Sequence, residues 1–199
     1  MLGAMKPPRR PLARRLPLRG VTIVELMVTL AIMAVLIAVA LPSMRDFVAR
    51  KRLEGVAQEL ITDLRLLKSQ QLMKGRLTVI RFGSNSDQTC YALYVKGTGR
   101  VLDCDCTRPA GSECGADGLA GRPELIRLVS VPRSSGVTVT TDRTDMSLAG
   151  IDGMPVGNAT LRATVESSRT GSIRVSTNAV GLPSICSVSG VYGAVTPCQ

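Results

Sequence analysis

One apolar stretch near the N-terminus limits what this chain can fold into more than any other feature. Between residues 21 and 41 the only clearly polar side chains are Thr22, Glu25 and Thr29. About 20 apolar residues in helical form are long enough to cross the hydrocarbon core of a bilayer. The stretch is too long for a secretory signal peptide, and no small-residue cleavage site follows it. The sequence therefore predicts a membrane-spanning helix over residues 21–41 that stays attached to the chain.

A basic, proline-rich segment of 20 residues precedes this stretch. It holds six of the 25 Lys and Arg residues and no acidic residue. By the positive-inside rule it keeps the N-terminus in the cytoplasm and places the C-terminal part outside, in the periplasm of a Gram-negative cell. Without this segment the formal net charge falls from +10 to +4, because 19 basic residues then stand against 15 acidic ones. The high net charge is therefore a weak argument for nucleic-acid binding.

Glu25 places a carboxylate inside the apolar stretch. An ionised carboxylate there costs about 2.5–3.5 kcal/mol on insertion scales, so we interpret Glu25 as a functional residue. If the chain is cut after Gly20, the new amine of Val21 on a neighbouring, staggered copy lies at the right spacing to meet Glu25. The competing interpretation is an ordinary signal anchor with Glu25 near the membrane interface.

The sequence Arg19-Gly20-Val21-Thr22-Ile23-Val24-Glu25-Leu26 resembles the cleavage signal of type IV pilins and type II secretion pseudopilins. In that signal a basic leader ends in Gly, and the mature chain carries Glu at its fifth position. Val21 departs from the family, which usually starts its mature chain with Phe. The resemblance implies that a prepilin peptidase removes residues 1–20, whereas the departure at Val21 leaves methylation of the new terminus open. It also implies an inner-membrane precursor whose helix packs with other pilins or pseudopilins, with Glu25 as the docking group.

Residues 42–74 are predicted to continue the helix in amphipathic form. The apolar residues follow the three-four spacing of one helix face, which we expect to cover a sheet: Leu53, Val56, Leu60, Leu64 and Leu67. The charged residues are predicted on the other faces: Arg52, Glu59, Asp63, Arg65 and Lys68. Pro42 removes one helical hydrogen bond and is expected to kink or loosen the helix. Gly75 suits the left-handed position past a helix end.

Residues 75–199 are predicted to form a head domain of short antiparallel strands. The β-branched and alternating segments are 76–82, 91–95, 125–131, 137–141, 159–165 and 172–176, with the last one or two strands within 187–195. The turn residues at 83–87 predict a hairpin, whereas 97–124 and 142–157 are predicted as loop and turns. The expected fold class is α+β: a long N-terminal helix packed on a small antiparallel sheet, as in the pilin fold that the resemblance implies.

Two further stretches, residues 57–79 and 172–186, resemble the GspH/FimT branch of minor pilins. This implies a structural subunit, not an enzyme, that helps to initiate or cap a type IV pilus or a type II secretion pseudopilus; the sequence leaves both open. The sequence has no His residue and no Gly-rich phosphate loop, so these sources of catalytic chemistry are missing. A membrane-anchored periplasmic binding module remains an alternative.

A DNA-binding minor pilin for natural transformation is a further alternative. Some members of the branch use a Gly-Arg-x-Arg motif in the closing hairpin, and the corresponding residues here are Gly181-Leu182-Pro183-Ser184. Both arginines are missing from this stretch. Arg169 and Arg174 lie nearby and offer phosphate contacts, but so few basic residues give weak, salt-sensitive binding. The tyrosines that could stack on bases are few: Tyr91, Tyr94 and Tyr192.

Six cysteines with no histidine indicate disulfides in an oxidising compartment. We pair Cys186 with Cys198, which are close in sequence around the last strand region; a disulfide-closed terminal segment is also common in pilins. Cys104 and Cys114 are paired across the Gly-rich loop. A metal knuckle at Cys104-x-Cys106 with Cys114 fits the usual ligand spacing poorly. A Ca²⁺ site formed by Asp142, Asp145 and Asp152 matches no known spacing. We therefore expect no metal or other cofactor.

Overall fold

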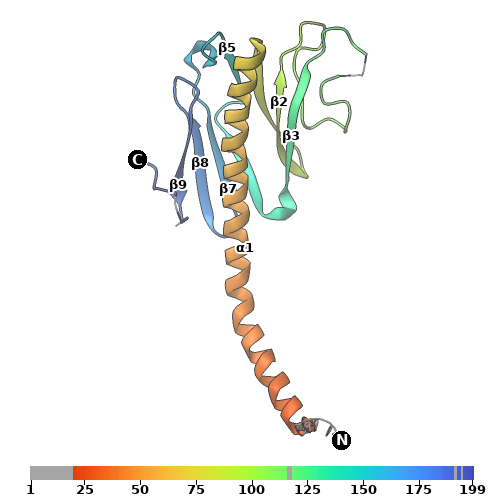
Figure 1. Ribbon diagram of the computed structural model, residues 1–199, viewed down its shortest axis with the longest axis vertical. Helices are drawn as coiled ribbons and strands as arrows, with labels where there is room; N and C mark the ends of the chain where they lie inside the picture. The colour runs from red at the N-terminus through yellow and green to blue at the C-terminus, as the bar shows by residue number, and fades with distance from the viewer. Residues whose placement is uncertain (1–19, 116–117, 191, 194) are drawn as a thin grey trace, which may run out of the picture. The chain divides into compact units, whose positions relative to one another are not determined.

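The computed structural model describes residues 20–199 except 116, 117, 191 and 194. The predicted leader therefore lies outside the described residues, apart from its last residue, Gly20. The chain divides into two compact units, residues 1–42 and 43–199. The helix α1 (Ile23–Lys74) has 52 residues and runs through the boundary between them; Figure 1 follows it from red to yellow. The kink expected at Pro42 stays a prediction.

The ends of α1 follow from local chemistry. At its C-terminus Gly75 adopts a left-handed backbone with φ 61°, and its N–H donates to the carbonyl of Gln71 at 2.8 Å. This confirms the helix end that the sequence predicts, because a residue without a Cβ reaches this conformation at no steric cost. In the first unit every residue from Gly20 to Leu41 is exposed. The helix is long and apolar enough to cross a membrane.

The second unit contains two antiparallel sheets and the C-terminal part of α1. The first sheet has the order β3-β2-β1-β5-β6, from β1 (Thr78–Ser84), β2 (Gln88–Val95), β3 (Glu124–Pro132), β5 (Asp145–Ala149) and β6 (Met154–Pro155). The second has the order β4-β7-β8-β9, from β4 (Val137–Thr141), β7 (Arg162–Ser167), β8 (Gly171–Thr177) and β9 (Pro183–Ser189). Two short 3₁₀ turns are η1 (Arg133–Ser135) and η2 (Val156–Asn158). The predicted α+β class is confirmed, but the strands form two sheets instead of one.

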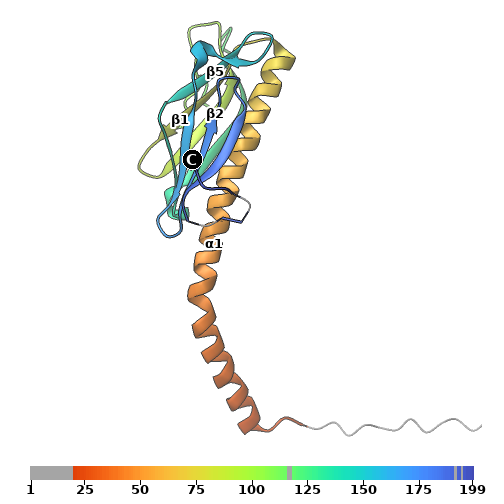
Figure 2. The same ribbon diagram turned by 90° about the vertical axis from the view of Figure 1, so that its left-hand side faces the viewer.

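The hydrophobic core of this unit lies between α1 and the two sheets. Figure 2 shows the upper part of α1 lying along the strands. The predicted apolar stripe is buried at Leu53, Leu60, Leu64 and Leu67, and Val56 packs against it half-buried. These side chains share one core cluster with Leu93 of β2 in the first sheet. The same cluster includes Val165 of β7 and Ile173 of β8 in the second sheet. Complete burial of a leucine is worth about 1.5–3 kcal/mol, so the stripe holds the helix on both sheets.

Three parts of the strand prediction were wrong. β5 and β6 lie inside residues 142–157, where the sequence predicts only turns. In β5 the buried Met146 and Leu148 alternate with less buried residues, but Gly and Asp residues on both sides conceal so short a strand. β7 begins at Arg162, whereas the sequence predicts a start at 159. β9 begins at Pro183, before the predicted 187–195, because an edge strand tolerates the missing N–H of proline.

The loop between β2 and β3 is tied to the first sheet by disulfides. Cys104 joins Cys114 within the loop, and Cys106 joins Cys90 of β2. Gly83 of β1 lies beneath: a Cβ there would come 3.0 Å from the Cys106 sulfur and 2.9 Å from Thr107, so glycine is needed for this close approach. Cys186 of β9 joins Cys198. These bonds coincide with the two expected pairings and add a third, and non-reducing peptide mapping is the test of all three.

Candidate functional site

The N-terminal end of α1 brings the predicted cleavage and docking residues together. Thr22 precedes the helix, and its Oγ1 accepts a hydrogen bond from the backbone N–H of Glu25 at 3.2 Å. The carbonyl of Thr22 accepts the N–H of Leu26 at 3.1 Å, which starts the helical ladder. Thr22 is therefore the N-cap, and Glu25 occupies the third helical position. This places Glu25 one helical turn from Val21, where the new N-terminus would lie.

This cap was not predicted from the sequence, although its signal is visible there. Thr22-x-x-Glu25 has the spacing of a capping box, in which Ser or Thr is followed three residues later by Glu or Gln. An acid in the first helical turn is also favoured by the helix dipole. Glu25 thus has a local reason to be present besides docking. Glutamine serves equally well in a capping box, so its substitution for Glu25 separates the two roles.

Glu25 and the apolar residues around it are exposed in the described part of the first unit. Among the described residues the Glu25 carboxylate has no hydrogen-bond or ion-pair partner, and the side chain is exposed. The apolar side chains beyond it are also exposed, for example Ile23 at 80% and Val39 at 72%. A surface this apolar, carrying one unpaired acid, requires lipid or other protein to cover it. The arrangement is suited to packing with other helices that present a cation opposite Glu25.

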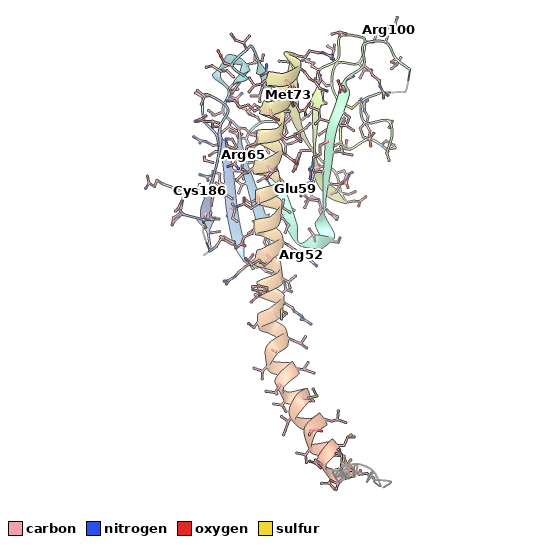
Figure 3. The ribbon with its side chains drawn as sticks, viewed as in Figure 1. Arg52, Glu59, Arg65, Met73, Arg100 and Cys186 are labelled. Atoms are coloured by element: carbon pink, nitrogen blue, oxygen red, sulfur yellow. A yellow bond between two sulfur atoms is a disulfide. The ribbon has the colours of Figure 1, made fainter. Side chains whose placement is uncertain are left out.

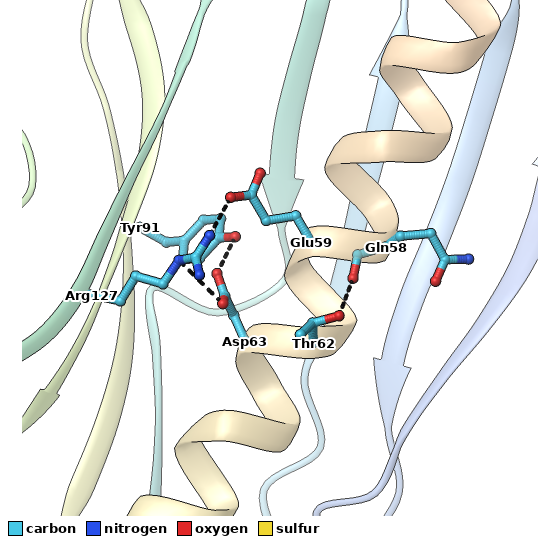
Figure 4. Close-up of polar contacts among 6 residues, drawn as sticks. All are labelled: Gln58, Glu59, Thr62, Asp63, Tyr91 and Arg127. Atoms are coloured by element: carbon cyan, nitrogen blue, oxygen red, sulfur yellow. Dashed lines mark hydrogen bonds and ion pairs between the residues drawn. The ribbon is translucent and has the colours of Figure 1, made fainter.

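A second polar cluster lies within the head, between α1 and the first sheet. The prediction that Asp63 lies on an outer face of the helix was wrong: its side chain is 0% exposed. Figure 4 shows Asp63 and Glu59 of α1 with Tyr91 of β2 and Arg127 of β3. The Tyr91 hydroxyl donates to Asp63 Oδ2 at 2.8 Å, and Arg127 Nε lies 3.3 Å from Oδ1. Arg127 Nη2 donates to Glu59 Oε1 at 2.6 Å, on the side of α1 where Figure 3 labels Glu59. Polar partners on two strands explain why an acid is buried here.

Burial sets the electrostatics of this cluster. Desolvation raises the pKa of Asp63 above its ordinary value, although the Tyr91 hydrogen bond and the Arg127 charge act in the opposite direction. Desolvation and the neighbouring Asp63 raise the pKa of Tyr91, so the phenol keeps its proton and donates. The hydrogen bond to Glu59 is the main cause of the raised pKa of Arg127.

The residues considered for DNA binding do not form a base-stacking surface. Tyr91, Tyr94 and Tyr192 are at most 2% exposed. Arg174 lies in β8 and Arg169 in the turn before it. Gly181 lies in the turn before β9 with φ 73°. Stacking requires an open aromatic face, which these tyrosines do not offer.

Four of the residues considered for metal binding make other contacts in the structure. The sulfurs of Cys104, Cys106 and Cys114 are in disulfides. Asp142 Oδ1 accepts the backbone N–H of Arg162 at 2.8 Å, which fixes the turn before β7. Within the described part of the chain, no three Cys, Asp or Glu residues gather as metal ligands.

Comparison with known proteins gives a structural likeness. No protein-family model and no curated protein sequence matches the chain. A crystal structure of the type IV minor pilin FimU from Pseudomonas aeruginosa PAO1, in space group P21, matches with a TM-score of 0.48 and 15% identity, over 70% of this chain and 91% of that chain. A second FimU crystal structure, in space group P65, matches with a TM-score of 0.46 and 12% identity, over 66% and 90%. The likeness is to a minor pilin.

Proposed function

We propose that this protein is a minor pilin or minor pseudopilin, a structural subunit of a filament assembled from inner-membrane precursors. The observation that carries the proposal is the register of Gly20, Val21 and Glu25 at the start of an exposed apolar helix. In a bilayer the apolar side chains of residues 21–41 are solvated by lipid. In a filament, neighbouring helices cover them instead. The head lies in the periplasm, and the basic leader in the cytoplasm.

The proposed mechanism begins with cleavage. A prepilin peptidase removes residues 1–20 and creates an amine at Val21, which family resemblance suggests is then methylated. Glu25 of this subunit pairs with the Val21 amine of a neighbour, so that two charges costly to bury singly enter the filament together. The subunit helps to initiate or cap a type IV pilus or a type II secretion pseudopilus. No enzymatic role is proposed.

Co-expression of the full chain with a prepilin peptidase tests the first step. We expect a shortened product whose N-terminal residue is Val21, as read by mass spectrometry. Gly20→Val should abolish the shortening, because the peptidase requires the small residue before the cut. Gly3→Val in the same leader is the matched control and should be cleaved as the parent is. A parent chain that stays at full length, or a Gly20→Val chain that is shortened equally, contradicts the proposal.

A further inference from the structure

We propose that Asp63, Tyr91 and Arg127 form a proton-controlled latch between α1 and the first sheet, and that proton uptake by Asp63 tightens it. The proposal concerns how firmly the head holds its helix. It goes beyond filament assembly and does not depend on it.

The latch joins three elements through one buried carboxyl group. Asp63 is fully buried among core leucines, including Leu60 and Leu64 on the same helix. Oδ2 accepts the Tyr91 hydrogen bond from β2. Oδ1 has no hydrogen bond to any of the described residues and lies 3.3 Å from Arg127 Nε. A buried carboxylate with one oxygen lacking a hydrogen bond is costly in its ionised form. The neutral form removes most of that cost.

The part of β3 held by the latch has an irregular ladder. β2 pairs Leu93 with Arg127 and Tyr94 with Leu125, so the register shifts there and Ile126 is left unpaired. β3 is also an edge strand of the first sheet. A bulged edge strand opens more easily than a central one. The side-chain contacts of Arg127 with Glu59 and Asp63 therefore add to the buried Val129 and Val131 in holding β3 to α1.

The direction of the pH response follows from linkage. When β3 separates locally from α1, water reaches Asp63 and its pKa returns toward the ordinary value. In the closed state burial raises that pKa, so the closed state binds the proton more tightly. Acidification therefore favours the closed latch, and this advantage is lost as the pH rises through the raised pKa. The groups that face Asp63 are Glu59 on α1, Tyr91 on β2 and Arg127 on β3; the Tyr91 and Arg127 contacts oppose the shift without reversing it.

Two measurements on the full-length chain in detergent micelles test the latch. The first is an NMR titration of ¹³C-labelled aspartate carboxyl groups, in which the pKa of Asp63 should lie above the ordinary value of an aspartate. The second is amide exchange of β3, corrected for the intrinsic effect of pH. Local opening should increase as the pH rises from the ordinary aspartate range to the Asp63 midpoint, by up to about tenfold per pH unit for one proton, and should level off above the midpoint.

Three variants sharpen the test. Asp63→Asn keeps the acceptor for Tyr91 and should make the corrected exchange of β3 independent of pH. Arg127→Gln removes the nearest cation and should move the Asp63 midpoint upward, a readout that a merely structural residue would not change. Asp152→Asn, at an exposed aspartate, is the control and should change neither. An Asp63 midpoint in the ordinary range, or one that Arg127→Gln leaves unchanged, overturns the proposal. If Asp63→Asn does not fold, the Asp63 midpoints measured in the parent and in Arg127→Gln still test the proposal.

Discussion

Glu25→Gln should yield a protein that is cleaved after Gly20 and retained in the membrane but strongly depleted from filaments. Glutamine keeps the shape of glutamate and remains suitable for the capping box with Thr22, so the helix start is preserved. Only the charge is lost. Removing one partner of a buried ion pair typically costs about 3–5 kcal/mol, because the other charge stays buried without a partner. Quantifying the subunit in sheared filaments and in membranes of the same cells measures the effect.

The controls separate docking from a general effect of charge or capping. Asp46→Asn changes an exposed acid of α1 outside the apolar stretch and should leave filament content unchanged. Thr22→Ala weakens the cap, at a typical cost of about 1 kcal/mol, but keeps the Glu25 charge. It should reduce filament content less than Glu25→Gln does. A Glu25→Gln subunit that enters filaments as the parent does would show that the carboxylate is not a docking group.

Leu60→Ala should produce a large loss of stability in the head. Leu60 is fully buried in the core between α1 and the two sheets. Truncating a buried leucine removes its transfer free energy and leaves a cavity, which together cost about 2–5 kcal/mol. Denaturant unfolding of the full-length chain in detergent, followed by a signal from the head, gives the change in the free energy of unfolding.

Leu72→Ala is the matched control for this prediction. It makes the same substitution in the same helix, at a side chain that is 50% exposed. We expect a smaller loss, because less apolar surface returns to water and a half-exposed site leaves no closed cavity. Equal losses of unfolding free energy for the two variants would show that the buried leucines of α1 do not form the main contacts of the core.

The sequence predicted those parts of the fold whose signal is periodic. The spacing of Leu53, Leu60, Leu64 and Leu67 placed the buried face of α1, because the helical repeat alone decides which side chains share a face. Gly75 marked the helix end through a conformation that glycine reaches most easily. The hairpin of β1 and β2 was predicted from alternating strands around a turn cluster. Each of these signals is local to its own element.

The features that the sequence did not reveal depend on distant partners. Asp63 was predicted on the surface because a charge normally is, and its burial becomes acceptable only through Tyr91 and Arg127, which approach from strands formed later in the chain. β5 was missed because its pairing partner, β1, precedes it by more than sixty residues. The partner of Cys90 was left open because sequence spacing alone does not choose among the three cysteines of the following loop. For the candidate site, Gly20, Val21 and Glu25 stay predictions from the sequence, and what covers the exposed helix depends on other molecules.

The most direct test of the account is the N-terminus of this protein within purified filaments. Pili or pseudopili are sheared from cells that express the native chain, separated from membranes and analysed by mass spectrometry for the first peptide of this subunit. We predict that the subunit is present in small amounts and that its chain begins at Val21. Filaments that lack the subunit, or that contain it with residues 1–20 still attached, would contradict the claim that it is a processed filament subunit.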